Sequence, residues 1–165
     1  MLKRIVFVAL LVASIAAAGA LPRVRAGQPP AAKCKQVRGH ATSHTVPAAE
    51  CASPIGLCAA GQLYGGINGE LTLVATSLTP TQDTPATGVF VYTADDIIRT
   101  KRGDIYTKDA GVLNLTPGGT GDDMSISTIT GGTGDYAGAT GTLRIYGTFS
   151  DAGGEFNYEG QVCTP

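Results

Sequence analysis

Residues 129–143 read ITGGTGDYAGATGTL, a stretch in which five of the fifteen residues are glycine. Consecutive glycines can adopt positive φ, so Gly131 and Gly132 allow the chain to fold back tightly at the edge of a β structure. Tyr136 can then pack over the small residues that follow it. A phosphate-binding loop would require a following helix and often a lysine, and neither is present. The stretch therefore predicts a structural turn.

Short segments of alternating apolar and polar residues, separated by turn residues, extend from this turn in both directions. Glycine and proline occur too often for a long helix, and no apolar set repeats with the helical period. We expect strands at 36–46, 61–67, 70–78, 88–93, 96–102, 104–108, 111–115, 123–130, 141–149 and 154–163. Roughly eight to ten short strands are typical of a sandwich or an antiparallel barrel.

The final hairpin shows the alternation most clearly. Leu143, Ile145 and Phe149 share one face of its first strand, and polar residues occupy the other face. Phe156 and Tyr158 alternate with charged and amide residues in its second strand. Both strands are therefore expected to bury one face in an antiparallel sheet.

Residues 1–26 have the three regions of a secretory signal peptide: a basic start, an apolar run and small residues before the cleavage point. The apolar run is short for a helix that must cross roughly 30 Å of hydrocarbon, and a retained membrane anchor is the alternative. Cleavage after Ala26 fits best, with Ala18 and Ala20 as alternatives. We expect a secreted or periplasmic protein, with no membrane span after cleavage and a single domain over 27–165.

Removal of the signal peptide leaves an acidic chain. Four of the twelve basic residues and none of the thirteen acidic ones lie in 1–26, so the mature net charge is −5. An acidic surface repels phosphate backbones, and we therefore expect no nucleic-acid partner.

The mature chain contains four cysteines, Cys34, Cys51, Cys58 and Cys163. An even number in an exported protein predicts two disulfides, for which three pairings are open. Zinc is the alternative, but the spacings do not match the paired cysteines of structural zinc sites.

The stretch 129–143 closely resembles the GGTG–aromatic segment of the allene oxide cyclase and dirigent protein superfamily, and of secreted bacterial proteins with the same barrel. Residues 144–162 are similar to the last two strands of that family. The resemblance implies an all-β fold, an eight-stranded antiparallel barrel with an apolar lumen, often assembled as a homo-oligomer, a trimer. None of the family's catalytic or ligand-contacting residues can be matched here.

A barrel closed in this way implies a particular disulfide pairing. Cys34 opens the first expected strand and Cys163 ends the last, and closure places these two strands side by side. We therefore expect Cys34–Cys163, which leaves Cys51–Cys58 to clip the loop between them.

Two clusters suggest metal sites. Residues 118–123 match the start of a calcium-binding repeat, and Asp122 and Asp123 could hold calcium at a rim, but the repeat does not continue. His40 and His44 lie four apart, which on a strand is too far for one metal, so we interpret them as surface residues.

Two further motifs have simple structural interpretations. Asp95 and Asp96 are adjacent, and we expect them to be turn residues and not an acid–base pair. Residues 102–104 spell the adhesion tripeptide RGD, which a hairpin corner also explains.

The sequence contains no recognisable nucleophile, metal or cofactor set, so we expect no catalytic or cofactor-binding residues. The leading hypothesis is non-catalytic binding of a small apolar ligand in the lumen. One alternative is a cyclase-like or dirigent-like protein that steers a reactive intermediate, and another is a structural or adhesive surface protein. A charged side chain in the lumen would separate these hypotheses, and the candidates are Glu70, Arg99, Arg144 and Glu159.

Overall fold

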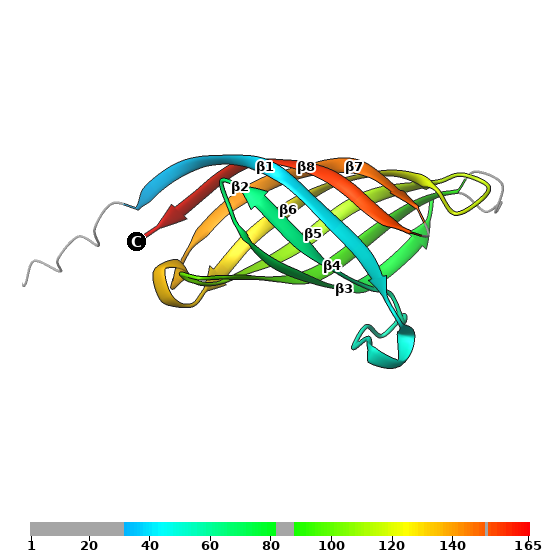
Figure 1. The fold of residues 1–165 in the computed structure, drawn as a ribbon, viewed down its shortest axis with the longest axis horizontal. Coiled ribbons are helices and arrows are strands. Elements are labelled where there is room, and N and C mark those ends of the chain that lie inside the picture. The colour runs from blue at the N-terminus through cyan, green and yellow to red at the C-terminus, as the bar shows by residue number, and fades with distance from the viewer. Residues whose placement is uncertain (1–31, 82–87, 151) are drawn as a thin grey trace, which may run out of the picture.

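The computed structural model describes residues 32–81, 88–150 and 152–165, whose eight antiparallel strands close into a barrel (Figure 1). The strands are β1 (Lys33–Val46), β2 (Cys58–Gly65), β3 (Gly69–Pro80), β4 (Val89–Thr100), β5 (Gly103–Leu115), β6 (Gly121–Gly132), β7 (Thr140–Ser150) and β8 (Gly153–Thr164). Each strand pairs with the next, and β1 pairs with β8. The predicted fold class is confirmed, whereas the predicted signal peptide lies outside the described residues.

The first difference from the sequence prediction is in the middle of the chain. The segments 88–93 and 96–102 are one strand, β4, and 104–108 and 111–115 are one strand, β5. The expectation that Asp95 and Asp96 form a turn is wrong. Alternation along β4 sends Asp95 to the outer face, where the Lys108 ammonium lies 2.7 Å away, and Asp96 to the interior. The strand β4 therefore continues through both residues.

The residues 129–143 form a structural turn, as predicted. β6 ends at Gly132, and the short helix η3 (Gly134–Tyr136) leads towards β7. Gly134 has a φ of +55°, and a Cβ at Gly132 would collide with the carbonyl oxygen of Asp104. Tyr136 packs against the hydrophobic core, so this turn covers one end of the barrel.

A hydrophobic core plugs the barrel at that end. Its buried members come from β1, β2, β4, β5, β6, β7, β8 and two connecting turns: Val37, Ala41, Leu63, Ile67, Ile98, Ile105, Ile129, Ala139, Leu143, Tyr158 and Val162. The predicted inward face of the final hairpin is confirmed, because Leu143 and Tyr158 belong to this core and Ile145 and Phe156 pack against it.

Tyr158 ties the β2–β3 turn to the core. Its hydroxyl accepts a hydrogen bond from the Ile67 N–H at 2.8 Å. The same hydroxyl lies 3.0 Å from the carbonyl oxygens of Tyr64 and Ile67, and it can donate to one of them. Because Tyr158 and Ile67 are buried, water cannot replace the hydrogen bonds that the Ile67 backbone makes to the Tyr158 hydroxyl.

We expect Tyr158→Phe to lower the free energy of unfolding by about 1–2 kcal/mol, because the buried Ile67 N–H loses its acceptor. Urea unfolding followed by circular dichroism measures the change. Tyr146→Phe is the matched control, since Tyr146 is exposed on the outer face. Equal stability of the two variants would contradict the role given to Tyr158.

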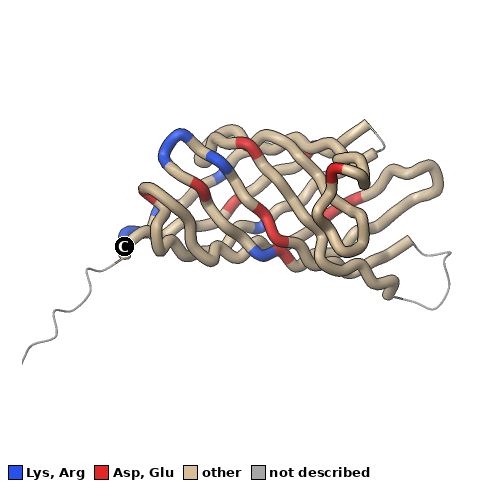
Figure 2. The backbone as a smooth tube through the Cα atoms, turned by 90° about the horizontal axis from the view of Figure 1, so that it is seen from below, with Lys and Arg blue, Asp and Glu red and all other residues tan. Residues whose placement is uncertain are grey.

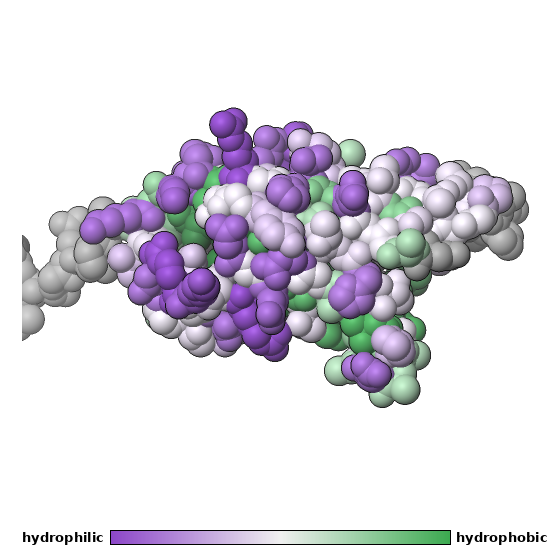
Figure 3. Space-filling view, in the orientation of Figure 1, coloured by the Kyte–Doolittle hydropathy of each residue, from purple (hydrophilic) through white to green (hydrophobic). Residues whose placement is uncertain are grey.

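Two disulfides join described residues, Cys34–Cys163 and Cys51–Cys58. Cys34 and Cys163 lie directly opposite each other where β1 pairs with β8, as barrel closure requires. Cys51–Cys58 holds the loop between β1 and β2, which contains the short helix η1 (Ala48–Glu50). In Figure 3 this loop projects from the barrel as a largely apolar lobe, and the most hydrophilic residues gather towards the opposite end. None of the helices in the described residues could span a membrane.

Candidate functional site

Beyond the plugged end, the lumen encloses a cavity of about 380 Å³. Its rim includes Leu57, Leu115, Gly119 and Gly153, which lie at the strand ends and loops farthest from η3. We call this end the mouth; it is on the right in Figure 1. A volume of this size is in the range of pockets that hold small organic molecules.

One wall of the cavity is apolar. It is built from inward-facing residues of β1, β2, β3, β7 and β8, including Ala41, Ala59, Leu63, Leu71, Leu73, Ile145 and Phe156. These strands follow the usual pattern of a barrel with a hydrophobic interior. The apolar lumen implied by the family resemblance is therefore present on this side.

The opposite wall, formed by β4, β5 and β6, is polar. We call it the acidic wall and define it by its inward-facing polar residues, Tyr92, Asp96, Thr107, Asp109, Asp123, Ser125 and Ser127. Ile98, Leu113 and Leu115 of the same strands also line the cavity. The outer face of the same strands carries exposed apolar side chains, among them Val91, Val112, Met124 and Ile126. Beside the cavity these strands therefore turn polar residues inward and apolar residues outward, whereas Ile98, Ile105 and Ile129 of the same strands face inward at the plugged end.

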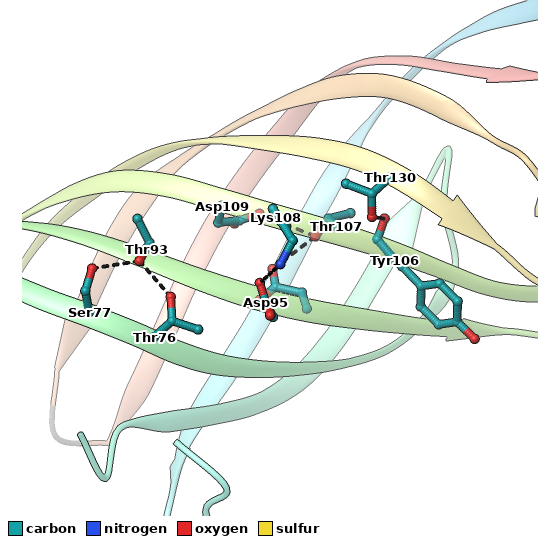
Figure 4. Close-up of polar contacts among 10 residues, drawn as sticks. Thr76, Ser77, Thr93, Asp95, Tyr106, Thr107, Lys108, Asp109 and Thr130 are labelled. Carbon is teal, nitrogen blue, oxygen red and sulfur yellow. Dashed lines mark hydrogen bonds and ion pairs between the residues drawn. The ribbon is translucent and has the colours of Figure 1, made fainter. Parts of the chain in front are cut away.

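Asp96 and Asp109 form the inner part of the acidic wall and are almost completely buried, at 5% and 4% exposure. The Thr107 hydroxyl lies 3.4 Å from a carboxyl oxygen of Asp96 and 3.3 Å from one of Asp109. The Thr107 hydroxyl has one proton and can donate it to only one of the two carboxyl groups. The other contact can be a hydrogen bond only if that carboxyl group is itself protonated. Figure 4 shows Thr107 and Asp109 on either side of Lys108, whose side chain meets Asp95 on the outer face.

Asp123, Tyr92 and Ser125 form the outer part of the acidic wall, nearer the mouth. Gly111 lies directly opposite both Tyr92 and Ser125 in the sheet, and a Cβ there would be 2.7 Å from the Ser125 Cβ. Glycine at this position therefore leaves room for the Tyr92 ring inside the barrel. The carboxyl group of Asp123 is half-buried beside this ring.

Three buried polar atoms of the acidic wall have no hydrogen-bond partner among the described residues: Asp96 Oδ1, Asp123 Oδ1 and Ser125 Oγ. Buried polar atoms are nearly always paired, because an unpaired one costs about 1–3 kcal/mol. All three belong to residues that line the cavity. The cavity therefore offers hydrogen-bonding capacity to whatever occupies it.

Burial disfavours charge throughout the acidic wall. It raises the pKa of Asp96 well above the ordinary aspartate value, and the nearby Asp109 charge raises it further. Burial also raises the pKa of Asp109, although the hydroxyl of Ser127 opposes the shift. The pKa of Asp123 is raised to about 6 by burial, against the effect of the neighbouring Tyr92 hydroxyl. Burial therefore favours the protonated form of Asp96 and Asp109, whereas Asp123 is mainly ionised above its pKa of about 6.

The charged residues predicted as lumen candidates all lie elsewhere. Glu70, Arg99, Arg144 and Glu159 are exposed on the outer face. Arg144 and Glu159 form an ion pair across β7 and β8, and Arg99 donates a hydrogen bond to the Thr72 hydroxyl at 2.9 Å. None of these four candidates faces the lumen, because each occupies an outward position on β3, β4, β7 or β8.

Neither pair of candidate metal ligands is brought together by the fold: alternation separates Asp122 from Asp123, and His40 and His44 are four residues apart on the exposed face of β1. Asp122 points outward and is exposed, whereas Asp123 points into the lumen. His40 stacks on Tyr64 on the outer face, with ring centroids 4.8 Å apart, and His44 is exposed. No group of three or more acidic, histidine or cysteine side chains in the described residues is arranged to hold a metal ion.

The RGD tripeptide forms the corner between β4 and β5, as the hairpin interpretation predicted. Gly103 has a φ of +128°, and the Arg102 guanidinium lies 2.7 Å from the Asp135 carboxylate. Arg102 also lies over the Tyr136 ring, 5.6 Å from its centroid. These contacts link the corner to η3 and explain the motif structurally.

Comparisons with known proteins add little to this description. No protein-family model matches the chain, and no curated protein sequence matches it either. Among solved structures, the pterocarpan synthase dirigent protein GePTS1 is similar over 84% of this chain and 88% of that chain, with 12% sequence identity and a TM-score of 0.34. A structural similarity this low gives no information about function.

Proposed function

We propose that this protein is an exported barrel that binds a small molecule with a mainly apolar body in its lumen. The observation that supports the proposal is a cavity of about 380 Å³ with one apolar wall and three unpartnered buried polar atoms on the other. Burying an apolar body against the apolar wall is favourable by about 25 cal/mol per Å² of surface removed from water. The unpartnered atoms would fix the orientation of the ligand.

A second candidate function is the steering of a reactive intermediate, as the family resemblance suggests. Asp96 favours it, because burial raises its pKa and a protonated carboxyl group can act as a proton donor inside the lumen. Conversion of a bound molecule into a product would support this candidate over simple binding. A barrel that binds nothing would support a structural or adhesive role.

The binding proposal is tested by filling the cavity. Ala59 lines the lumen and Ala60, its neighbour on β2, does not, so Ala59→Trp and Ala60→Trp are matched variants. The probe is N-phenyl-1-naphthylamine, an uncharged dye that fluoresces in apolar pockets. We expect Ala59→Trp to lower its affinity at least tenfold and Ala60→Trp to leave it unchanged. Binding that is equal in both variants, or absent from the parent protein, would contradict the proposal.

Export and self-association are further proposals. The two disulfides support an extracellular or periplasmic location, since such bonds persist in oxidising compartments. A homo-oligomer, a trimer by family resemblance, is expected from the sequence. Light scattering coupled to size-exclusion chromatography measures the oligomeric state, and a monomer at all concentrations would contradict the expectation.

A further inference from the structure

We propose that the ligand of the lumen carries a cationic head, a protonated amine, which lies on the acidic wall. The inference rests on the proposed binding function and adds the chemical class of the ligand. It combines three observations on the described part of the chain: buried carboxyl groups without a counter-cation, unpartnered acceptor atoms, and a mouth without basic residues.

The lumen has acidic groups but no cation to balance them. None of the described residues that line the cavity is a lysine or arginine, and its only histidine, His44, is exposed at the rim. Asp96 and Asp109 are both more than nine-tenths buried. A buried carboxyl group either keeps its proton or is ionised and paired with a cation, because an isolated buried charge is strongly disfavoured. A cation supplied by the ligand would provide that pairing.

The unpartnered atoms match the chemistry of an ammonium group. Asp96 Oδ1, Asp123 Oδ1 and Ser125 Oγ can all accept hydrogen bonds, and Ser125 is itself only 3% exposed. A primary ammonium group has three N–H donors and no acceptor. A carboxylate or phosphate head would be repelled by Asp123, which is mainly ionised above its pKa of about 6.

An organic cation fits better than a metal ion. The acidic side chains of the described residues are not grouped to hold a metal, and the facing wall of the cavity is hydrophobic. A hydrated ion gains nothing from that wall. An amine attached to an aliphatic or aromatic body uses both walls at once.

The mouth is also suited to a cation. No lysine or arginine among the described residues lies at the mouth, whereas Glu50, Asp122 and Glu155 lie in the loop or strand ends there. Figure 2 shows the basic positions near the plugged end and the middle of the barrel, with acidic positions continuing towards the mouth. An acidic entrance attracts cationic molecules and repels anionic ones.

Three probes of matched size test the charge preference: 2-(2-naphthyl)ethylamine, 2-(2-naphthyl)ethanol and 2-naphthylacetate. At pH 7.5 we expect calorimetric titration to show amine affinity at least tenfold above that of the alcohol, with the carboxylate weakest. The double variant Asp109→Asn with Asp123→Asn should abolish the preference. The matched outward variant, Asp95→Asn with Asp122→Asn, should retain it, because both residues are exposed.

The outcomes separate this inference from the proposed function. Equal affinity for amine and alcohol in the parent protein would overturn the cationic head and leave the binding function standing. Failure of all three probes to bind, together with failure of the uncharged dye, would overturn both. If the Asp109–Asp123 double variant does not fold, the comparison of the three probes on the parent protein still decides the question.

The pH dependence gives a second readout. Because the pKa of Asp123 is about 6, amine affinity should fall at least fivefold from pH 7.5 to pH 5, while alcohol affinity stays constant. An alkyl amine remains protonated over this range. The other titratable groups facing the cavity are Tyr92 and Asp96 on β4, Asp109 on β5, Tyr158 on β8 and His44 at the rim. His44→Gln is the control and should leave the fall unchanged; amine affinity that is independent of pH would contradict the proposal.

Discussion

Replacing Cys34 and Cys163 by serine is expected to lower the free energy of unfolding by about 5 kcal/mol. The disulfide connects residues 129 apart in sequence, so it removes a large part of the conformational freedom of the unfolded chain. It also fixes the pairing of β1 with β8, the contact that closes the barrel. Guanidinium unfolding of the parent protein and the variant, both under non-reducing conditions, measures the difference.

The second disulfide is the internal control. Cys51 and Cys58 are seven residues apart, and the same entropic relation gives about 2–3 kcal/mol for so short a loop. The double serine variant of this pair should therefore be clearly more stable than the Cys34–Cys163 variant. The reverse order would contradict the view that barrel closure depends on the long-range bond.

Asp96→Asn is expected to stabilise the protein at pH 8, because ionising a buried carboxyl group costs about 1.4 kcal/mol for each unit that its pKa lies above the ordinary value. The folded-state pKa of Asp96 is raised by burial, so the folded protein keeps a proton that the unfolded chain loses near pH 4. The stability of the parent protein should therefore fall as the pH rises from about 4 towards the raised pKa. Because asparagine is uncharged in both the folded and the unfolded protein, the decrease in stability caused by Asp96 should be absent from the variant.

Unfolding measured from pH 4 to pH 8 tests this expectation, with Asp95→Asn as the matched control. Asp95 is adjacent in sequence but exposed and paired with Lys108, and surface pairs contribute at most about 1 kcal/mol. Asp109 and Asp123 also have raised pKa values, so some pH dependence should remain in Asp96→Asn. A variant that is less stable than the parent protein at pH 8 would show that Asp96 is ionised in the folded state.

The sequence predicted the fold well because most strands have one clear apolar face. The alternation of Leu143, Ile145 and Phe149 is reproduced in the interior of the barrel, and the turn at 129–143 lies where its glycines require it. Barrel closure also placed Cys34 beside Cys163. These features depend on local patterns and on one topological argument, which a single sequence can supply.

The acidic wall could not be predicted in the same way. Met124 and Ile126 of β6 are apolar, so their composition alone suggests that they face inward. The structure exposes both and buries Ser125 and Ser127 instead. The interior face of these strands is determined by their pairing with neighbouring strands in the closed barrel, which a single strand's sequence does not reveal. The available signal was the pair Asp95–Asp96, since a strand through both acids must turn one of them inward.

Native mass spectrometry of the protein purified from its own host tests the central claim, that the lumen is a ligand site, most directly. We predict a bound small organic molecule on the parent protein and on Ala60→Trp, and its absence from Ala59→Trp, in which the cavity is filled. The bare polypeptide mass for all three proteins, together with no binding of apolar or cationic probes, would contradict the claim.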